Sequence, residues 1–240
     1  MTILGALRRH GLVKTIQLVS YRLVQRLIVL DVTQLMILDV ADAVAPADQD
    51  DLEFRFLTPD EVRSLSQEGT HGLEASLPDR ISNRGDLCFA AFAKSKLAGY
   101  AWFAFDQVVP ECNRGESLLT GVGISFPESM AFMYKGFVHR EFRGERIYGR
   151  LMSHALTLLA SRKTTHLLST ADWINFSAQR SCYRIGYRYL GLIWRFGGLS
   201  RMFTVLPKLP DPMGIRFANA PSDATPFSTV ENNVGSVSQP

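Results

Sequence analysis

Apolar residues in the second half of the chain follow the period of a helix. They recur at spacings of three and four after Gly144, at Ile147, Leu151, Ala155, Leu158 and Leu159. Residues 132–138 before this helix and 166–171 after it are short apolar runs that predict strands. Asn175 is suited to cap a second helix, which Gly186 would end. Two parallel strands joined by a crossover helix fit this unit best.

The remaining predicted strands are short and favour antiparallel pairing. They are residues 53–57, 87–93, 97–105, 187–196 and 202–206. Thr58 and Pro59, followed by two acids, are typical of a helix start, so we expect a helix over residues 59–68. The sequence Lys94-Ser95-Lys96 between two of the strands predicts a hairpin. We therefore expect a mixed α/β fold whose central, mostly antiparallel sheet is flanked by helices.

The predicted elements divide the chain into three parts. Residues 49–208 hold the domain, and residues 209–240, rich in Pro, Ser, Asn and Asp, are expected to form a flexible tail. Residues 1–48 are expected to be an N-terminal extension that ends in a linker over residues 39–52. The length of 240 residues and the apolar content of 46% allow one such domain with a substantial core.

The N-terminal extension is basic and amphipathic. From residue 4 to residue 30 every charge is positive and apolar residues repeat at helical spacing, which predicts one helix or a pair. Basic residues interrupt each apolar stretch, which argues against a membrane-spanning helix and against a cleavable signal peptide. Residues 4–30 are suited to lie on an anionic membrane or to bind an acyl carrier protein. The alternative is that they pack on the domain or pair two copies into a homodimer.

Cysteine spacing and net charge argue against a disulfide-rich protein, a metal-binding protein and a nucleic-acid-binding protein. Three widely spaced cysteines, Cys88, Cys112 and Cys182, form neither a disulfide framework nor a metal-binding pair, so no metal is expected. The simplest setting is reducing and cytoplasmic, with the extension allowing a peripheral location at the inner membrane face. A net charge of +3 gives no reason to expect nucleic-acid binding.

A short polar turn joins residues 132–138 to the helix after Gly144. Such a junction leaves unpaired backbone N–H groups at the positive end of the helix dipole. These groups form a ready site for a phosphate or pyrophosphate. Together with the Asn175 and Gly186 signals further on, the turn indicates an enzyme that uses a nucleotide cofactor.

Two sets of residues resemble the GNAT superfamily of acyl-CoA-dependent N-acyltransferases. The first is Val138-His139 followed by Phe142-Arg143-Gly144, and the second is Asn175, Ala178 and Gly186-Tyr187. In that family the first set reads valine, a few residues, an aromatic residue and Arg-Gly-x-Gly-x-Gly. The second reads Asn-x-x-Ala or Ser and then Gly-Phe eleven residues after the Asn, and this chain keeps that separation with Tyr187 in place of Phe.

The resemblance implies the GNAT-like acyltransferase fold and acyl-CoA, most simply acetyl-CoA, as cosubstrate. The backbone at residues 137–139 would hold the pantetheine arm, and the turn would bind the pyrophosphate. The implied cofactor-binding residues are Phe137, Val138, His139, Arg143, Gly144, Glu145, Arg146, Ile147, Tyr148, Gly149 and Asn175. Asn175 would bind the arm or order the loop. A primary amine would attack the thioester directly, without a covalent enzyme intermediate.

Two departures from the family pattern bear on the mechanism. Arg146 and Tyr148 replace the second and third glycines of the turn, and we expect both in helical conformation, which does not require glycine. Arg146 would contact a CoA phosphate or remain a solvated surface charge. Many family members carry a Tyr seven residues after the Asn, where it protonates the CoA thiolate, and Cys182 stands there in this chain. The candidate acids are therefore Tyr183, Cys182 and water. The alternative is that Tyr183 and Cys182 are both structural residues.

The sequence does not assign the base that takes a proton from the incoming ammonium. Lys135 and Tyr134 stand where the family often carries a carboxylate. Candidates elsewhere are Glu128, Asp106, Glu111, Glu116 and His139. Glu128 completes the candidate catalytic set with Tyr183 and Cys182.

The sequence therefore predicts an N-acyltransferase that moves an acetyl or other acyl group from acyl-CoA to a small-molecule primary amine. The acceptor is open, and the basic extension favours a precursor made at the cell envelope, such as an amino sugar or a polysaccharide precursor. One alternative is a long-chain N-acyl amino acid synthase that takes its acyl group from acyl carrier protein or long-chain CoA. Another is a non-catalytic protein that binds CoA as a scaffold.

Overall fold

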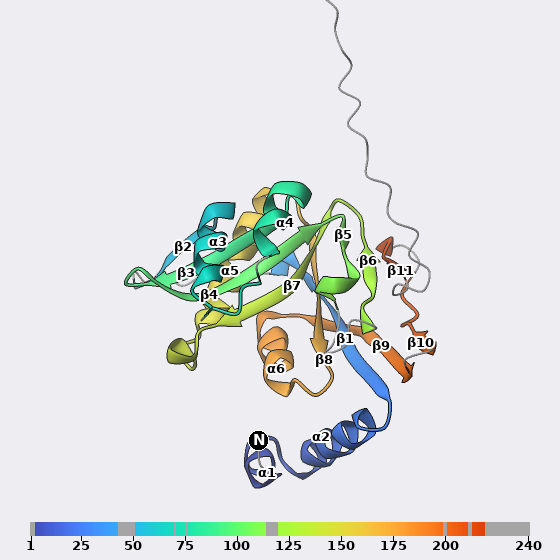
Figure 1. Cartoon of the computed structure of the whole chain (residues 1–240). Coiled ribbons are helices and arrows are strands. Elements are labelled where there is room, and N and C mark those ends of the chain that lie inside the picture. Colours follow the sequence, from blue (N-terminus) through green and yellow to red (C-terminus); the bar gives the residue numbers. More distant parts are fainter. Residues whose placement is uncertain are drawn as a thin grey trace, which may run out of the picture.

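A large β-sheet forms the centre of the molecule (Figure 1). The computed structural model describes residues 3–42, 51–69, 71–74, 76–113, 120–198, 201–210 and 213–218. The strands of the large sheet are β1 Val29–Asp39, β2 Glu53–Phe56, β3 Leu87–Ala93, β4 Lys96–Phe105, β7 Met130–Val138, β8 His166–Asp172, β9 Arg188–Gly198 and β10 Arg201–Val205. Their order is β10-β9-β1-β8-β7-β4-β3-β2. A smaller sheet, in the order β11-β6-β5, consists of β5 Gln107–Val108, β6 Gly123–Ser125 and β11 Arg216–Ala218.

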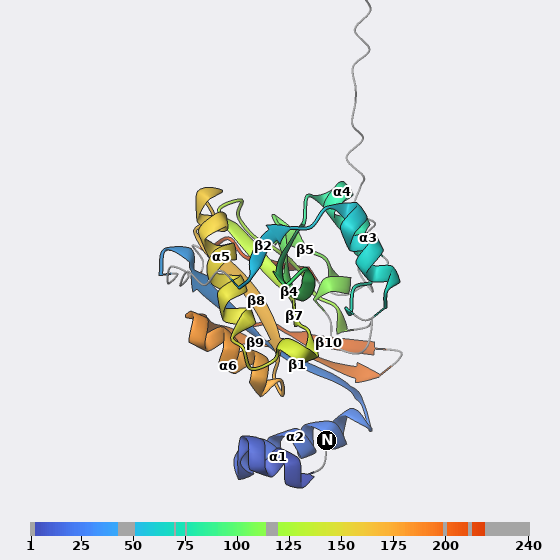
Figure 2. The ribbon, with the colours of Figure 1, turned by 90° about the vertical axis from the view of Figure 1, so that its left-hand side faces the viewer.

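Helices cover both faces of the large sheet (Figure 2). They are α1 Ile3–His10, α2 Leu12–Gln25, α3 Pro59–Gln67, α4 Leu77–Arg84, α5 Ile147–Ser161 and α6 Phe176–Ile185, with short 3-10 turns η1 Val40–Asp42, η2 Pro110–Cys112 and η4 Arg140–Phe142. Apolar residues of α5 and α6, including Leu151 and Cys182, pack on one face. Val62 of α3 and Leu77 of α4 pack on the other face. The expected mixed α/β fold is confirmed.

Most of the predicted helix ends are confirmed. Thr58 begins α3 with a capping box, Asn175 caps α6, and Gly186 ends α6 at φ 109°. Leu158 differs from its prediction as part of the apolar stripe of α5, because it is exposed while Leu159 is buried.

The N-terminal strand β1 lies inside the sheet, where it pairs antiparallel with both β8 and β9 (Figure 1). The sequence predicts that these residues belong to the extension and linker. Asp31 and Gln34 break the apolar run of β1, and so a strand is not evident from the pattern. The structure therefore moves the start of the domain from residue 49 to β1.

A buried ion pair fixes β1 to β9. Arg195 Nη2 lies 2.5 Å from Asp31 Oδ2, and both side chains are almost fully buried. Arg195 also donates hydrogen bonds to Thr33 Oγ1 at 2.9 Å and to Asn113 O at 3.1 Å. Burial lowers the pKa of Arg195, and the nearby Asp31 charge opposes that shift. The acid that interrupts the apolar pattern of β1 is thus a structural partner of a distant arginine.

Two of the predicted terminal segments fall partly outside the described residues. These are residues 43–50 of the predicted linker and residues 211–212 and 219–240 of the predicted tail. Residues 216–218 of that tail form β11, which pairs antiparallel with β6. None of the described helices is long and apolar enough to cross a bilayer.

Candidate functional site

β7 and β8 are parallel neighbours that separate before β7 ends (Figure 1). They pair over residues 130–133 of β7. β7 then continues to Val138 beside β4, its one partner there among the described strands. Residues 134–138 therefore have an open edge towards β8. Gly136 is exposed, although it lies in a strand at the middle of the sheet.

A β-bulge lies where β7 leaves β8. The register of β4 against β7 shifts so that Tyr134 has no partner on β4. Bulges bend a strand and increase its local twist. Ser169 Oγ on β8 donates a hydrogen bond to Met133 O at 2.8 Å, at the last point of contact between the two strands. The opening thus begins directly after Met133.

The turn after β7 leads into the start of α5. Gly144 has φ 103° and Arg146 has φ 57°, both in the left-handed region. A Cβ added at Gly144 would meet no atom within 4 Å, so the space beside the turn is open. Arg146 precedes α5 and gives no capping hydrogen bond to its described first turn, which leaves the helix N–H groups available to an anion. The expectation that Arg146 is helical is wrong, whereas Tyr148 lies in α5 as expected.

Basic side chains surround this turn. The exposed ones are Arg140, Arg143 and Arg146. Arg143 Nε also donates to the carbonyl oxygen of Val138 at 3.3 Å, which ties the turn to the end of β7. Arg150 forms a salt bridge with Asp51, with 2.6 Å between Nη2 and Oδ1. Arg150 is therefore engaged outside the turn, and the remaining arginines give it a positive surface.

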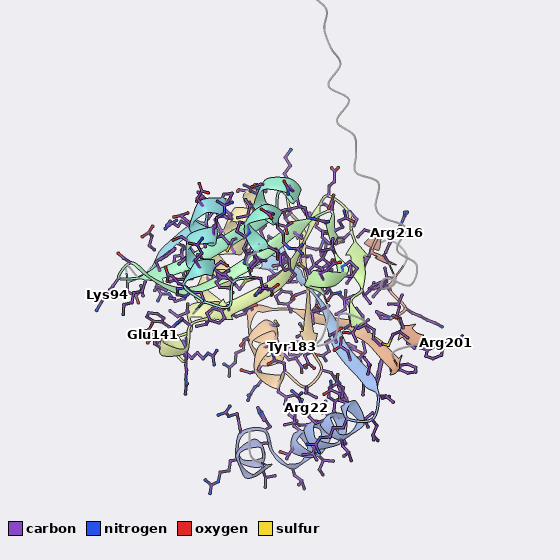
Figure 3. All side chains as sticks on the ribbon, viewed as in Figure 1. Arg22, Lys94, Glu141, Tyr183, Arg201 and Arg216 are labelled. Atoms are coloured by element: carbon purple, nitrogen blue, oxygen red, sulfur yellow. The ribbon has the colours of Figure 1, made fainter. Side chains whose placement is uncertain are left out.

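The other predicted cofactor-binding residues lie in or beside the same turn. His139 follows β7, and its Nδ1 lies 3.2 Å from Oε1 of Glu141, which Figure 3 labels in the turn. Phe137 stacks on Tyr100, so its ring faces α3 and α4. The side chain of Ile147 is buried in the core, which leaves its backbone for binding. The exposed or half-buried residues are Val138, Glu145 and Gly149.

Tyr148 extends from α5 to the open part of β7. A Cβ placed on Gly136 would lie 3.0 Å from Tyr148 Cε2, so the ring lies against the β7 backbone. The Tyr148 hydroxyl and the Cys182 thiol of α6 are near enough for each to influence the pKa of the other. Burial raises the pKa of Tyr148 well above its usual value and raises that of Cys182 to about 11. Both groups are therefore protonated at neutral pH, and a phenol O–H lies beside the opening.

The two residues predicted at opposite ends of α6 have partners within the fold. Asn175 Oδ1 accepts a hydrogen bond at 3.1 Å from the N–H three residues on, so its oxygen caps the helix. Tyr183, labelled in Figure 3, has its hydroxyl 3.4 Å from Gln34 Oε1 on β1. Cys182 faces α5 instead. The structure therefore brings Cys182 together with Tyr148 and not with Tyr183.

A buried carboxyl group contacts β7 from the face that carries α3 and α4. The Tyr134 hydroxyl donates to Asp86 Oδ2 at 3.0 Å, and Asp86 is 3% exposed. Burial raises the pKa of Asp86, while the Tyr134 hydrogen bond and the charges of Arg80 and Arg84 oppose the shift. Asp86 therefore holds a proton more readily than a solvated acid does. Asp86 is not evident from the sequence, because its partner is 48 positions away and no local pattern marks it.

The predicted bases lie away from this opening or outside the described residues. Glu128 is exposed in the turn before β7, eight residues from Gly136, which corresponds to roughly 26 Å of strand. Asp106 follows β4 at the same end of the sheet, and burial raises its pKa. Glu111 lies in η2, and Glu116 is outside the described residues. The geometry thus favours Asp86 over these acids.

These features together can hold an extended anionic ligand and move protons at its side. The open edge of β7 can hydrogen-bond to amide groups, and the start of α5 can bind a phosphate. Tyr148 can donate a proton on the face of α5 and α6. Asp86 can accept one through Tyr134 on the opposite face.

The fold occurs in solved structures, although no protein-family model and no curated protein sequence matches this chain. A GCN5-related N-acetyltransferase from Sphaerobacter thermophilus is similar over 79% of this chain and 57% of its own, at 12% identity and a TM-score of 0.50. An acetyltransferase from the GNAT family of Novosphingobium aromaticivorans is similar over 70% of this chain and 64% of its own, at 17% identity and a TM-score of 0.48. This chain thus spans less than two thirds of the length of these structures. It has the fold of the GNAT N-acetyltransferases.

Proposed function

We propose that this protein is an acyl-CoA-dependent N-acyltransferase that moves an acyl group, most simply acetyl, to a primary amine. The observation that carries the proposal is the open edge of β7 over residues 134–138, which leads directly into the turn before α5. An acyl-CoA donor combines an extended arm of amide groups with a pyrophosphate. The strand edge offers hydrogen bonds to the arm, and the turn offers N–H groups to the pyrophosphate.

The residues of the turn suit the phosphate end of such a donor. The space beside Gly144 is open, so a ligand can approach the backbone closely. The exposed arginines, Arg140, Arg143 and Arg146, add positive charge for charge-assisted hydrogen bonds. Tyr148 lies against Gly136 and narrows the opening on the α5 side, which places its hydroxyl at the border of the space left for the arm.

Tyr148 is the proposed acid. As the amine nitrogen bonds to the acyl carbon, the carbon–sulfur bond breaks and the sulfur leaves as a thiolate. The Tyr148 hydroxyl is protonated at neutral pH and lies beside the opening, near Cys182, so it can supply the proton. Tyr183 faces Gln34 on β1 and therefore has no part in this proposal.

Asp86 is the proposed base, and it acts through Tyr134. A primary amine is an ammonium ion at neutral pH and must lose a proton before it attacks. Tyr134 can take that proton while it passes its own to Asp86, to which it already donates a hydrogen bond. The raised pKa of Asp86 suits a proton acceptor that works near neutrality. The acceptor would then approach from the face that carries α3 and α4.

Thermal melting with CoA, acetyl-CoA and palmitoyl-CoA tests the proposal. A ligand that binds the native state at about a hundred times its Kd adds roughly 2.7 kcal/mol of stability and raises Tm by several degrees. A shift with acetyl-CoA supports the proposal, and a shift with palmitoyl-CoA alone indicates a long-chain donor. No shift with any of the three contradicts it. Release of free thiol from acetyl-CoA across a panel of amines then tests turnover.

A non-catalytic CoA-binding role is the second candidate. Two observations favour it: Arg146 and Tyr148 stand at glycine positions of the GNAT pattern, and the Tyr148 ring narrows the opening at Gly136. Binding of acetyl-CoA without thiol release on any amine would support this second role over the first.

A further inference from the structure

Helices α1 and α2 lie at the edge of the molecule, away from the main body of the sheet (Figures 1 and 2). Nine of the fourteen large apolar side chains that are exposed in the described part of the chain belong to this region and the segment after it. They are Leu7, Leu12, Val13, Ile16, Val19, Leu23, Val24, Leu27 and Ile28. A concentration of exposed apolar side chains of this kind marks a binding surface.

One face of α2 is fixed to the domain. Tyr21 is buried, and its hydroxyl accepts a hydrogen bond from the Val32 N–H at 2.9 Å. The Tyr21 ring lies 5.9 Å from the ring of Trp173. Gln25 Nε2 donates to the carbonyl oxygen of Leu30 at 2.9 Å. With this face held in place, α2 cannot rotate its opposite face into the core.

The opposite face of α2 is an apolar stripe. Its members follow one another at spacings of four, three and four, and they are Leu12, Ile16, Val19 and Leu23. Ile16 is 59% exposed and Leu23 is 58% exposed, so the stripe faces solvent. Side chains project outward from α2 in Figure 3. A short helix with one apolar face and one polar face lies in the plane of a membrane interface and does not cross the bilayer.

All charges around the stripe have the same sign. The charged residues between positions 3 and 30 are Arg8, Arg9, Lys14, Arg22 and Arg26, and each is exposed. A second copy of this surface would bring positive charges against positive charges, which disfavours a homodimer through this face. An anionic lipid leaflet attracts the same charges and accepts the apolar stripe.

We propose that α1 and α2 bind the surface of an anionic lipid bilayer. The apolar stripe enters the interface, and the arginines contact lipid phosphates. The His10 ring lies 5.3 Å from the ring of Phe176, the first residue of α6, and Lys14 Nζ lies 5.1 Å from that ring. Membrane binding therefore holds the Asn175 end of α6 close to the bilayer and brings the candidate site to the membrane surface.

Vesicle flotation of the full chain tests this proposal. We expect the protein to float with phosphatidylglycerol-containing vesicles and to bind pure phosphatidylcholine far more weakly. Ile16→Ser combined with Leu23→Ser should weaken binding by about a hundredfold, at roughly tenfold for each aliphatic side chain. Arg8→Gln combined with Arg26→Gln should weaken binding to anionic vesicles by about twenty-fivefold, at roughly fivefold for each charge.

The matched control is Leu158→Ser combined with Val205→Ser, which removes two exposed apolar side chains outside the N-terminal helices. This control should bind vesicles like the unchanged protein, and thermal melting should show that all variants are folded. Failure of the unchanged protein to bind anionic vesicles would overturn the proposal. So would a dimer in sedimentation velocity that Ile16→Ser with Leu23→Ser dissociates, because the stripe would then be a protein interface.

Discussion

Tyr148 and Tyr183 differ in what their hydroxyl groups contact, and this difference separates their roles. The Tyr148 hydroxyl lies near Cys182 beside the open part of β7, whereas the Tyr183 hydroxyl faces Gln34 on β1. In the sequence, Tyr183 is the natural choice because it stands one position from the site where the GNAT pattern carries a tyrosine. In the structure, the phenol near that site belongs to Tyr148, which lies on α5 and not on α6. The acid therefore comes from α5 in our proposal.

We predict that Tyr148→Phe lowers kcat about tenfold to a hundredfold, because a general acid contributes at least this much. The KM for the donor should change little, since Phe keeps the ring against Gly136. Tyr183→Phe is the matched control and should leave kcat unchanged. Steady-state rates of thiol release measure both. The opposite pattern, with loss of activity in Tyr183→Phe alone, would restore Tyr183 as the acid.

Asp86→Asn separates the proposed catalytic role of Asp86 from its effect on stability. Asn can still accept the Tyr134 hydrogen bond, so we expect kcat to fall about a hundredfold while the fold is kept. Burial raises the pKa of Asp86 from its usual 3.8. The charged form is thus disfavoured in the folded state, and this cost is absent below pH 3.8 and complete above the raised pKa.

The stability of the unchanged protein relative to Asp86→Asn should therefore fall as pH rises from 3.8 through the raised pKa. Thermal melting of both proteins across this range measures the difference. At neutral pH the variant should melt at the same temperature or higher. A variant that melts lower at neutral pH and keeps full activity would show that Asp86 is a structural acid.

At the scale of elements, α5 begins with an arginine in a conformation that glycine adopts more easily. Arg146 has φ 57°, and the left-handed region costs a residue with a Cβ about 1–2 kcal/mol. We predict that Arg146→Gly raises the free energy of unfolding by about 1 kcal/mol and weakens CoA binding about tenfold, since one charged contact is lost. Urea denaturation and calorimetry measure the two effects.

Lys163→Gly is the control for Arg146→Gly. Lys163 has φ 65° and follows the other end of α5, about 25 Å along the helix from Arg146. It should gain similar stability without any change in CoA binding. A loss of stability in Arg146→Gly would mean that the arginine side chain stabilises the turn in a way that this structure does not show.

Strand β1 makes the N-terminal region part of the fold. It lies between β8 and β9 and carries Asp31, the partner of the buried Arg195. We predict that a chain starting at residue 28 unfolds cooperatively, with a lower Tm because the packing of α2 is lost. A chain starting at residue 43 should not fold, since its sheet lacks the strand that joins β8 to β9. Cooperative melting of this shorter chain would contradict the assignment of β1.

For the whole molecule, local signals in the sequence predict most helices and strands. The features that the sequence does not reveal depend on contacts between distant residues. Asn175 and Gly186 mark the two ends of α6. Both are predictable because a helix cap and a glycine in the left-handed conformation act within one helical turn. Strand β1 is not evident from the sequence because Asp31 interrupts its apolar pattern. The partner that allows Asp31 to be buried, Arg195, is far away in the sequence. The fold class needed only the order of elements. The pairing of Asp86 with Tyr134 depends on the three-dimensional fold, because no sequence pattern joins the two residues.

In our proposal, the turn before α5 binds the pyrophosphate of an acyl-CoA donor. Isothermal titration calorimetry with acetyl-CoA tests it on the unchanged protein, on Gly144→Val and on Gly85→Val. Gly85 also has a positive φ and open space around it, but it ends α4, so it controls for backbone strain. We predict that acetyl-CoA binds the unchanged protein and Gly85→Val alike, and binds Gly144→Val at least tenfold more weakly, because the valine side chain fills the open space and strains the turn. Equal binding to Gly144→Val, or no binding to the unchanged protein, would show that this turn is not the pyrophosphate site.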